Sequence, residues 1–226
     1  MSNKKDIYND VKLDPSLVFS FIKQEKFELV YELIDKNIVN INEVDNLGND
    51  VLTRLLKARE YTYVGLLMKK KNWNVNHQNV EGNTFGHILA MDNSPMAVKV
   101  VEELTKKSNY LPNIKNNKNQ TAMDIALSNN YLCTAFKILE DKRFNNIDFT
   151  SFKNLFTTSI QNKDYGKYSK INNLEIIVDT LEKKDLNSTI RKIINMIIEN
   201  MDRIKNDIMN NKSYTLEAII NSYARA

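Results

Sequence analysis

A short segment recurs three times in this chain, each time just before an apolar helical stretch. The copies read GNDVL at residues 48–52, GNTFGH at 82–87 and NQTAMD at 119–124. Their equivalent starting positions are Asp45, Asn79 and Asn116, which are 34 and 37 residues apart. Periods of roughly 20 to 50 residues are typical of repeat architectures, in which stacked units bury a core that no single unit could form. The spacing therefore predicts a stack of helical repeats rather than one globular core.

Within each copy the residues predict a turn, a short helix, a second turn and a longer helix. In the second copy, Gly82 permits a tight turn and Thr84 can cap the short helix. Pro95 suits the first position of the longer helix, because its missing N–H has no partner to lose there. The longer helix has an apolar residue at every third position, namely Val98, Val101 and Leu104.

These residues resemble the ankyrin repeat family. The segment GNTFGHILA at 82–90 is similar to the family signature G-x-T-P-L-H-x-A-A, with Thr84 and His87 in the family positions. The segment NVNHQN at 74–79 resembles the D-V-N-x-x-D junction between repeats, and 40–45 and 112–117 repeat that pattern. The resemblance covers roughly residues 15–149, with 16–34 as a degenerate capping pair. It implies an all-α, ankyrin-like helical solenoid, and the departures at Asp50 and Asn119 predict looser hairpins in the first and third units.

Beyond residue 149 the match fades, so we expect two parts: repeats over 1–149 and a C-terminal helical extension over 150–226. Apolar spacing predicts helices at 150–161 and 173–184, and a last helix at 214–223 capped by Ser213. A further seam has spacings of four and three over about five turns of helix. This seam predicts either a core-facing helix or a homodimer contact, and it comprises Ile190, Ile194, Ile197, Met201, Ile204 and Ile208.

Residue counts argue against several classes of function. The net charge of +4 is too small and too dispersed to predict a nucleic-acid partner. No phosphate-binding glycine motif is present, and the two histidines, His77 and His87, both occupy repeat positions. The resemblance implies that His87 bonds to Thr84 within its hairpin. We therefore expect no enzymatic activity, no cofactor and no metal.

Three further features concern compartment and packing. The single cysteine, Cys133, lies at helical spacing among apolar residues and predicts a buried thiol in a reducing compartment. The chain shows no leader and no run of about 20 apolar residues, so we expect a soluble, cytoplasmic protein without a membrane partner. Trp73 predicts either packing at a repeat junction or a projecting binding anchor.

In ankyrin-like stacks the hairpin tips and the first helices form a concave binding face, and the register assigns such positions here. Leu47, Val80 and Met91 would be exposed apolar residues within a polar rim. The resemblance extends to divergent ankyrin proteins of large DNA viruses or intracellular parasites, which implies a host protein as partner. The alternative is an assembly role through the C-terminal helices. The predicted partner-binding residues are Asn46, Leu47, Asn49, Lys57, Val80, Glu81, Asn83, Met91, Asp92, Asn117, Lys118, Gln120 and Asn129.

Overall fold

The computed structural model describes residues 4–145, 147–161, 167–210, 212 and 216–223, and over these residues the protein is all-α. Its only bridge of strand type within them joins Val44 to Asp50. The chain forms two compact units, residues 1–125 and 126–226, which divide within helix α8, Ala122–Ser128. The predicted change from repeats to extension after residue 149 stays a prediction.

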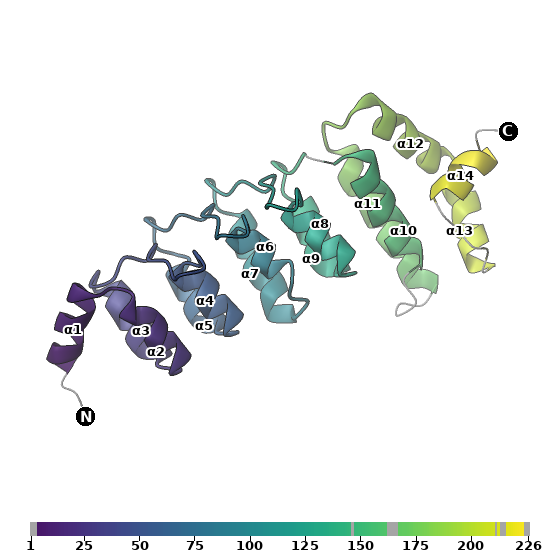
Figure 1. Ribbon diagram of the computed structural model, residues 1–226. Coiled ribbons are helices and arrows are strands. Elements are labelled where there is room, and N and C mark those ends of the chain that lie inside the picture. The colour runs from purple at the N-terminus through teal and green to yellow at the C-terminus, as the bar shows by residue number, and fades with distance from the viewer. Residues whose placement is uncertain (1–3, 146, 162–166, 211, 213–215, 224–226) are drawn as a thin grey trace. The chain divides into compact units, whose positions relative to one another are not determined.

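The first unit is built from successive helix pairs (Figure 1). The first helix of each pair packs against the first helix of the next, and the second helices do the same. Figure 1 shows these pairs side by side in chain order. The helices are α1 (Lys4–Leu13), α2 (Leu17–Lys23), α3 (Phe27–Asp35), α4 (Val51–Lys57), α5 (Tyr61–Leu67), α6 (Phe85–Leu89) and α7 (Pro95–Thr105).

Local sequence accounts for where these helices begin and turn. Ser94 caps α7 by accepting the N–H of Ala97 at 3.2 Å, with Pro95 at the first helical position. The buried face of α7 consists of Ala97, Val100, Val101 and Leu104, while Val98 is half-buried. The face therefore follows the i, i+3, i+4, i+7 pattern of a core-facing helix rather than the strict spacing of three that we expected.

Helix α1 precedes the predicted stack and is held to α3 by polar contacts. Glu32 on α3 accepts hydrogen bonds from the Tyr8 hydroxyl at 2.5 Å, the Lys36 ammonium at 2.6 Å and the Lys4 ammonium at 3.0 Å. Hydrogen bonds from Lys36, Tyr8 and Lys4 lower the pKa of Glu32 from 4.5 to about 2. An ionised carboxylate therefore contributes to the attachment of α1, together with the fully buried Val11 and the packing of α1 against α2.

The second unit contains α9 (Leu132–Leu139), α10 (Phe149–Gln161), α11 (Lys167–Glu182), α12 (Ser188–Glu199), α13 (Met201–Met209) and α14 (Leu216–Tyr223). The predicted helices at 150–161 and 173–184 are confirmed as α10 and α11, which pack together, although α11 begins six residues earlier. The predicted cap Ser213 and the start at Tyr214 lie outside the described residues. Buried Lys184 donates to the carbonyl oxygens of Asp141 at 2.8 Å and Phe144 at 2.7 Å, which ties the loop after α9 to the end of α11.

Candidate functional site

Each of the three recurring segments forms a hairpin closed by a single side chain. In the second hairpin, Oδ1 of Asn79 accepts the N–H groups of Glu81 at 3.0 Å and Asn83 at 2.9 Å. The N–H of Asn79 donates to the carbonyl of Asn83 at 3.0 Å. Asp45 and Asn116 make the same set of bonds in the first and third hairpins. Our prediction that the first and third hairpins are looser than the second is therefore wrong.

The fourth residue of each hairpin explains why the third copy does not need glycine. Gly48, Gly82 and Asn119 adopt left-handed backbone conformations, with φ of 70°, 74° and 58°. Asparagine tolerates this region better than most residues, so it can take the glycine position. At Gly82 a Cβ atom would also lie 2.7 Å from the backbone nitrogen of Asn117, so glycine is required there by space as well.

The hairpins are joined to one another by a repeated backbone bond. The N–H of Val80 donates to the carbonyl of Leu47 at 3.1 Å, and the N–H of Asn117 donates to the carbonyl of Glu81 at 3.0 Å. These are equivalent positions in successive hairpins. The tips therefore form a continuous edge with a fixed spacing, from which side chains project.

Two predicted partner-binding residues are structural instead. Asn49 and Asn83 are 1% and 5% exposed, and each accepts a side-chain hydrogen bond from the next hairpin. Nδ2 of Asn79 lies 3.1 Å from Oδ1 of Asn49, and Nδ2 of Asn116 lies 2.8 Å from Oδ1 of Asn83. The prediction that Asn49 and Asn83 are available to a partner is wrong, because both side chains are buried and both Oδ1 atoms accept a hydrogen bond from the next hairpin.

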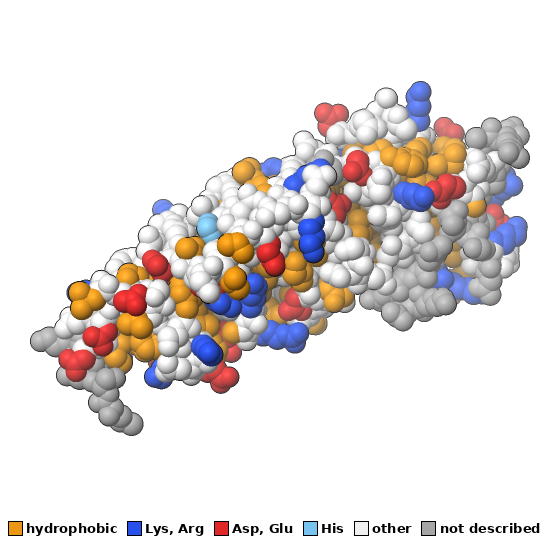
Figure 2. All heavy atoms as spheres, viewed as in Figure 1, with side chains coloured by type: hydrophobic (Ala, Val, Ile, Leu, Met, Phe, Trp, Pro, Cys, Tyr) orange, Lys and Arg blue, Asp and Glu red, His pale blue; other side chains and the backbone are white. Residues whose placement is uncertain are grey.

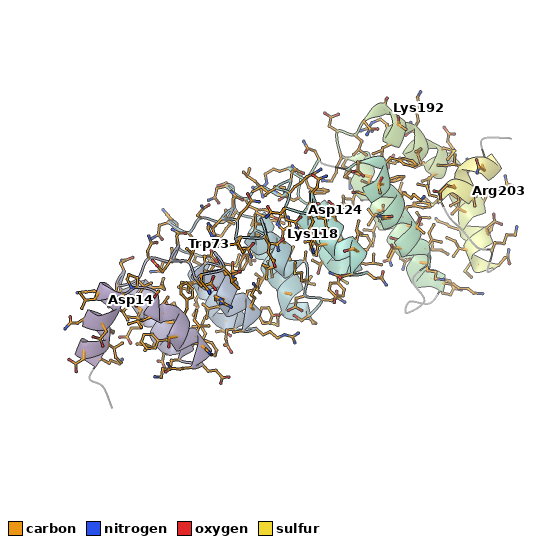
Figure 3. The ribbon with its side chains drawn as sticks, viewed as in Figure 1. Asp14, Trp73, Lys118, Asp124, Lys192 and Arg203 are labelled. Carbon is orange, nitrogen blue, oxygen red and sulfur yellow. The ribbon has the colours of Figure 1, made fainter. Side chains whose placement is uncertain are left out.

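The remaining tip residues face outward. Leu47 is 47% exposed and Val80 is 61% exposed, and Met91, at the end of α6, is 46% exposed. We name as the hairpin face the exposed tip residues Asn46, Leu47, Val80, Glu81, Asn117 and Lys118. Asn129, which is also exposed, belongs to the second unit. Figure 3 labels Lys118 among the projecting side chains of the third hairpin.

Five other predicted residues take part in contacts within the chain. Glu81 accepts the side-chain amide of Asn83 at 2.8 Å, and Asn117 donates its side-chain amide to the carbonyl of Val80 at 3.0 Å. The exposed Lys57 donates to Oδ1 of Asn49 at 2.9 Å. Half-buried Asp92 accepts the hydroxyl of Tyr61 and the N–H of Ser94. Burial raises the pKa of Asp92, but these hydrogen bonds outweigh it and hold the pKa below its usual value. The backbone carbonyl of half-buried Gln120 accepts a hydrogen bond from a histidine of the preceding repeated segment, His87.

That histidine, His87, links two hairpins. Its Nδ1 accepts the N–H of Thr84 at 3.1 Å and lies 2.7 Å from the Thr84 hydroxyl, which confirms the expected bond within the hairpin. Since Nδ1 is an acceptor, the ring proton is assigned to Nε2, which lies 2.9 Å from the carbonyl of Gln120. Burial lowers the pKa of His87, so the neutral ring is the structural form. His77 makes a similar link, with Nε2 2.8 Å from the carbonyl of Gly48.

Trp73 lies at the junction between two helix pairs (Figure 3). It is 3% exposed, and its Nε1–H donates to Oδ2 of Asp50 at 2.8 Å. The other oxygen of Asp50 caps α4 by accepting the N–H of Thr53 at 2.7 Å. The ring meets Phe85 edge to face at 5.0 Å, and the Lys107 ammonium lies 5.6 Å from its centroid. The packing interpretation is confirmed, and the projecting anchor is wrong.

The C-terminal seam does not offer a free surface. Ile190, Ile194, Ile197, Ile204 and Ile208 are at most 5% exposed. The seam is also divided at Asn200 between α12 and α13, which both pack against α11. Our prediction of one continuous helix along this seam is therefore wrong. These side chains, with half-buried Met201, lie in the core of the second unit, and the homodimer contact through this seam stays a prediction.

A groove of about 1090 Å³ adjoins the first hairpin and was not predicted from the sequence. It lies where α2 and α4 pack together, and Asn46 and Lys57 line it from the predicted set. Phe19 and Lys23 of α2 also line it. No motif identifies these two residues, because the first helix pair lacks the repeat signature.

The remaining features of the described residues concern metal ligands, the cysteine and membrane-spanning helices. No group of three His, Cys, Asp or Glu side chains is arranged there to hold a metal ion. Cys133 is exposed rather than buried, because the apolar face of α9 is formed by Leu132, Ala135 and Leu139. Every helix in the same described ranges is too short or too polar to span a bilayer. Comparison of the sequence with models of protein families and with curated proteins finds no match.

Proposed function

We propose that this chain is an ankyrin-like helical solenoid that acts as a non-enzymatic protein-interaction module in the cytoplasm. Its partner is a protein that binds the hairpin face together with the groove beside α2 and α4. The observation that carries the proposal is that Leu47 and Val80 are large apolar side chains, exposed at successive tips of a hydrogen-bonded edge. Adjacent exposed apolar residues within a polar rim are typical of interaction surfaces.

The chemistry of the tips supports a specific partner. At one equivalent position the three hairpins carry Leu47, Glu81 and Lys118, which are apolar, acidic and basic in turn. The order of these side chains is fixed because the bonded edge sets their spacing. An ordered row of different chemistries selects partners by complementarity and by repulsion of mismatched charges.

The test is partner capture with a matched set of variants. The tagged chain, a Leu47→Ala/Val80→Ala/Met91→Ala variant and a Leu111→Ala/Ile176→Ala control are each expressed in cells, and recovered proteins are quantified. The resemblance to viral and parasite ankyrin proteins makes host cells the first choice. Leu111 and Ile176 are 56% and 47% exposed and lie off the hairpin face, so the control removes similar apolar surface.

We expect one or a few proteins to be recovered with the chain and the control but not with the triple variant, at unchanged thermal stability. Equal recovery with the triple variant would show that the hairpin face is not the binding surface. Recovery of nothing above background in any cell type that carries the protein would refute the interaction role.

A further inference from the structure

A second groove lies away from the hairpins, between the second helices α5 and α7. It has a volume of about 670 Å³, and none of the predicted partner-binding residues lines it. Its apolar floor includes buried Met68 and Val100, and Leu66 and Met96 at its sides are 39% and 45% exposed. We name it the outer groove. It is independent of the hairpin face, so the inference below does not depend on the proposed function.

A glycine lines the outer groove. Gly65 is exposed in the middle of α5, and a Cβ atom added there would have no heavy atom within 4 Å. Glycine is the least favourable helix-interior residue after proline, and no backbone strain or close contact within the chain requires it here. A helical glycine facing open space is suited to the close approach of another backbone.

The rim of the outer groove is basic. Lys69, Lys99, Lys106 and Lys107 line it against a single acidic residue, Glu103. Lys106 pairs with Glu103 at 2.8 Å. Lys69 and Lys99 have no ion pair with any residue that the structure describes. On the face drawn in Figure 2, hydrophobic side chains lie beside Lys and Arg side chains over α5 and α7.

From this geometry we infer that the outer groove docks an acidic amphipathic helix of a partner protein. Two packed helices present ridges and a groove into which a third helix can pack its apolar stripe. Helix α7 has 11 residues, or about 16 Å, which matches roughly three turns of a docked helix. Carboxylates flanking that stripe would meet Lys69 and Lys99, and its closest approach would be at Gly65.

The lining favours a peptide over the other polyanions. Among the residues that line the outer groove there is no arginine, and its floor is mainly aliphatic. Nucleic acids are bound through many phosphate contacts and by stacking on aromatic or guanidinium planes. Membrane surfaces are bound by projecting apolar side chains rather than by a recess. A recess with apolar walls and a basic rim is complementary to an acidic amphipathic helix.

The probe is a displayed library of random peptides of about sixteen residues, long enough to span α7 as a helix. The library is selected on the full chain, and enriched peptides are tested by fluorescence anisotropy. The variants are Gly65→Phe, which fills the outer groove, and Lys69→Glu/Lys99→Glu, which reverses its rim. The control is Leu111→Phe, which enlarges an exposed side chain outside the outer groove, and circular dichroism verifies that all variants are folded.

We expect enriched peptides to carry net negative charge and apolar residues at spacings of three and four. Gly65→Phe and the double lysine variant should each weaken binding at least about tenfold, and Leu111→Phe by less than about twofold. No enrichment, enrichment of neutral or basic peptides, or peptides insensitive to both variants would overturn the inference. Binding of RNA oligonucleotides or phosphatidylserine vesicles that both variants abolish, without acidic peptides, would also overturn it.

Discussion

Replacement of Trp73 by phenylalanine should destabilise the first unit through one buried hydrogen bond. The Nε1–H group of Trp73 donates to Oδ2 of Asp50, and both residues are at most 3% exposed. A hydrogen bond to a charged group is worth about 1.5–3 kcal/mol. The smaller ring buries roughly 40 Å² less, which costs about 1 kcal/mol. The free energy of unfolding should fall by about 2.5–4 kcal/mol, which corresponds to a midpoint lower by roughly 5–16 °C.

A double-mutant cycle separates the hydrogen bond from the packing. Asp50→Ser removes the carboxylate oxygen that Trp73 uses, while a serine can still cap α4. Trp73→Phe should cost about 1 kcal/mol or less in the Asp50→Ser background, which gives a coupling energy of about 1.5–3 kcal/mol. The assay is urea denaturation followed by far-ultraviolet circular dichroism, because Trp73 is the sole tryptophan and fluorescence is lost with it. An equal cost in both backgrounds would refute the reasoning.

Three further predictions concern backbone freedom and titration. Gly65→Ala should raise the free energy of unfolding by about 0.5–1 kcal/mol, whereas Gly82→Ala should lower it by about 1–2 kcal/mol or more. The two differ because, of these two glycines, only Gly82 has a positive φ and a backbone atom close to the added Cβ. Urea denaturation measures both changes, and changes of the same sign would contradict the geometry. The buried His87 has a pKa below its usual 6.5, so its contribution to stability is complete above pH 6.5 and falls as the pH drops, because only the unfolded chain takes up the proton there. Thermal midpoints measured against pH should fall with decreasing pH, and His87→Gln should reduce this dependence. The pKa of Glu32 is about 2 in the folded chain against an ordinary 4.5, so its contribution to the stability of α1 is present above about pH 4.5 and lost as the pH falls toward 2. Hydrogen exchange should show α1 opening in that pH range, and Glu32→Gln should abolish this pH dependence.

The sequence predicts the elements whose signals are local. The glycine at 82, the cap at Thr84 and the proline at 95 each act within a few residues, and the structure has a turn and helix starts there. For Trp73 the sequence leaves packing and a projecting anchor open, and only its burial and its bond to Asp50 decide between them. The helical content follows from apolar periodicity, because a buried helix face needs that spacing.

The features that the sequence misses depend on distant contacts. Helix α1 has few apolar residues and is held by Glu32, 24 residues beyond its Tyr8. Apolar spacing continues across Asn200, so periodicity cannot reveal the break between α12 and α13. The buried amides of Asn49 and Asn83 look the same in sequence as exposed ones, because only the neighbouring hairpin decides whether their oxygens are used.

The amide ladder of the hairpins has a direction. Asn79 and Asn116 each point an NH₂ group at the hairpin that precedes them, while Asp45, in the first of the three hairpins, has a carboxylate in that place and pairs with Arg54. Each later hairpin therefore carries its own donor to an acceptor that lies earlier in the chain. Removing the first hairpin would strand the buried amide donor of Asn79, and removing the third would strand the buried Nε2–H group of His87, which donates to the carbonyl of Gln120. The amide ladder can be completed in the order of synthesis, but shortening the array at either end leaves one buried donor unpaired and should destabilise the hairpins that remain.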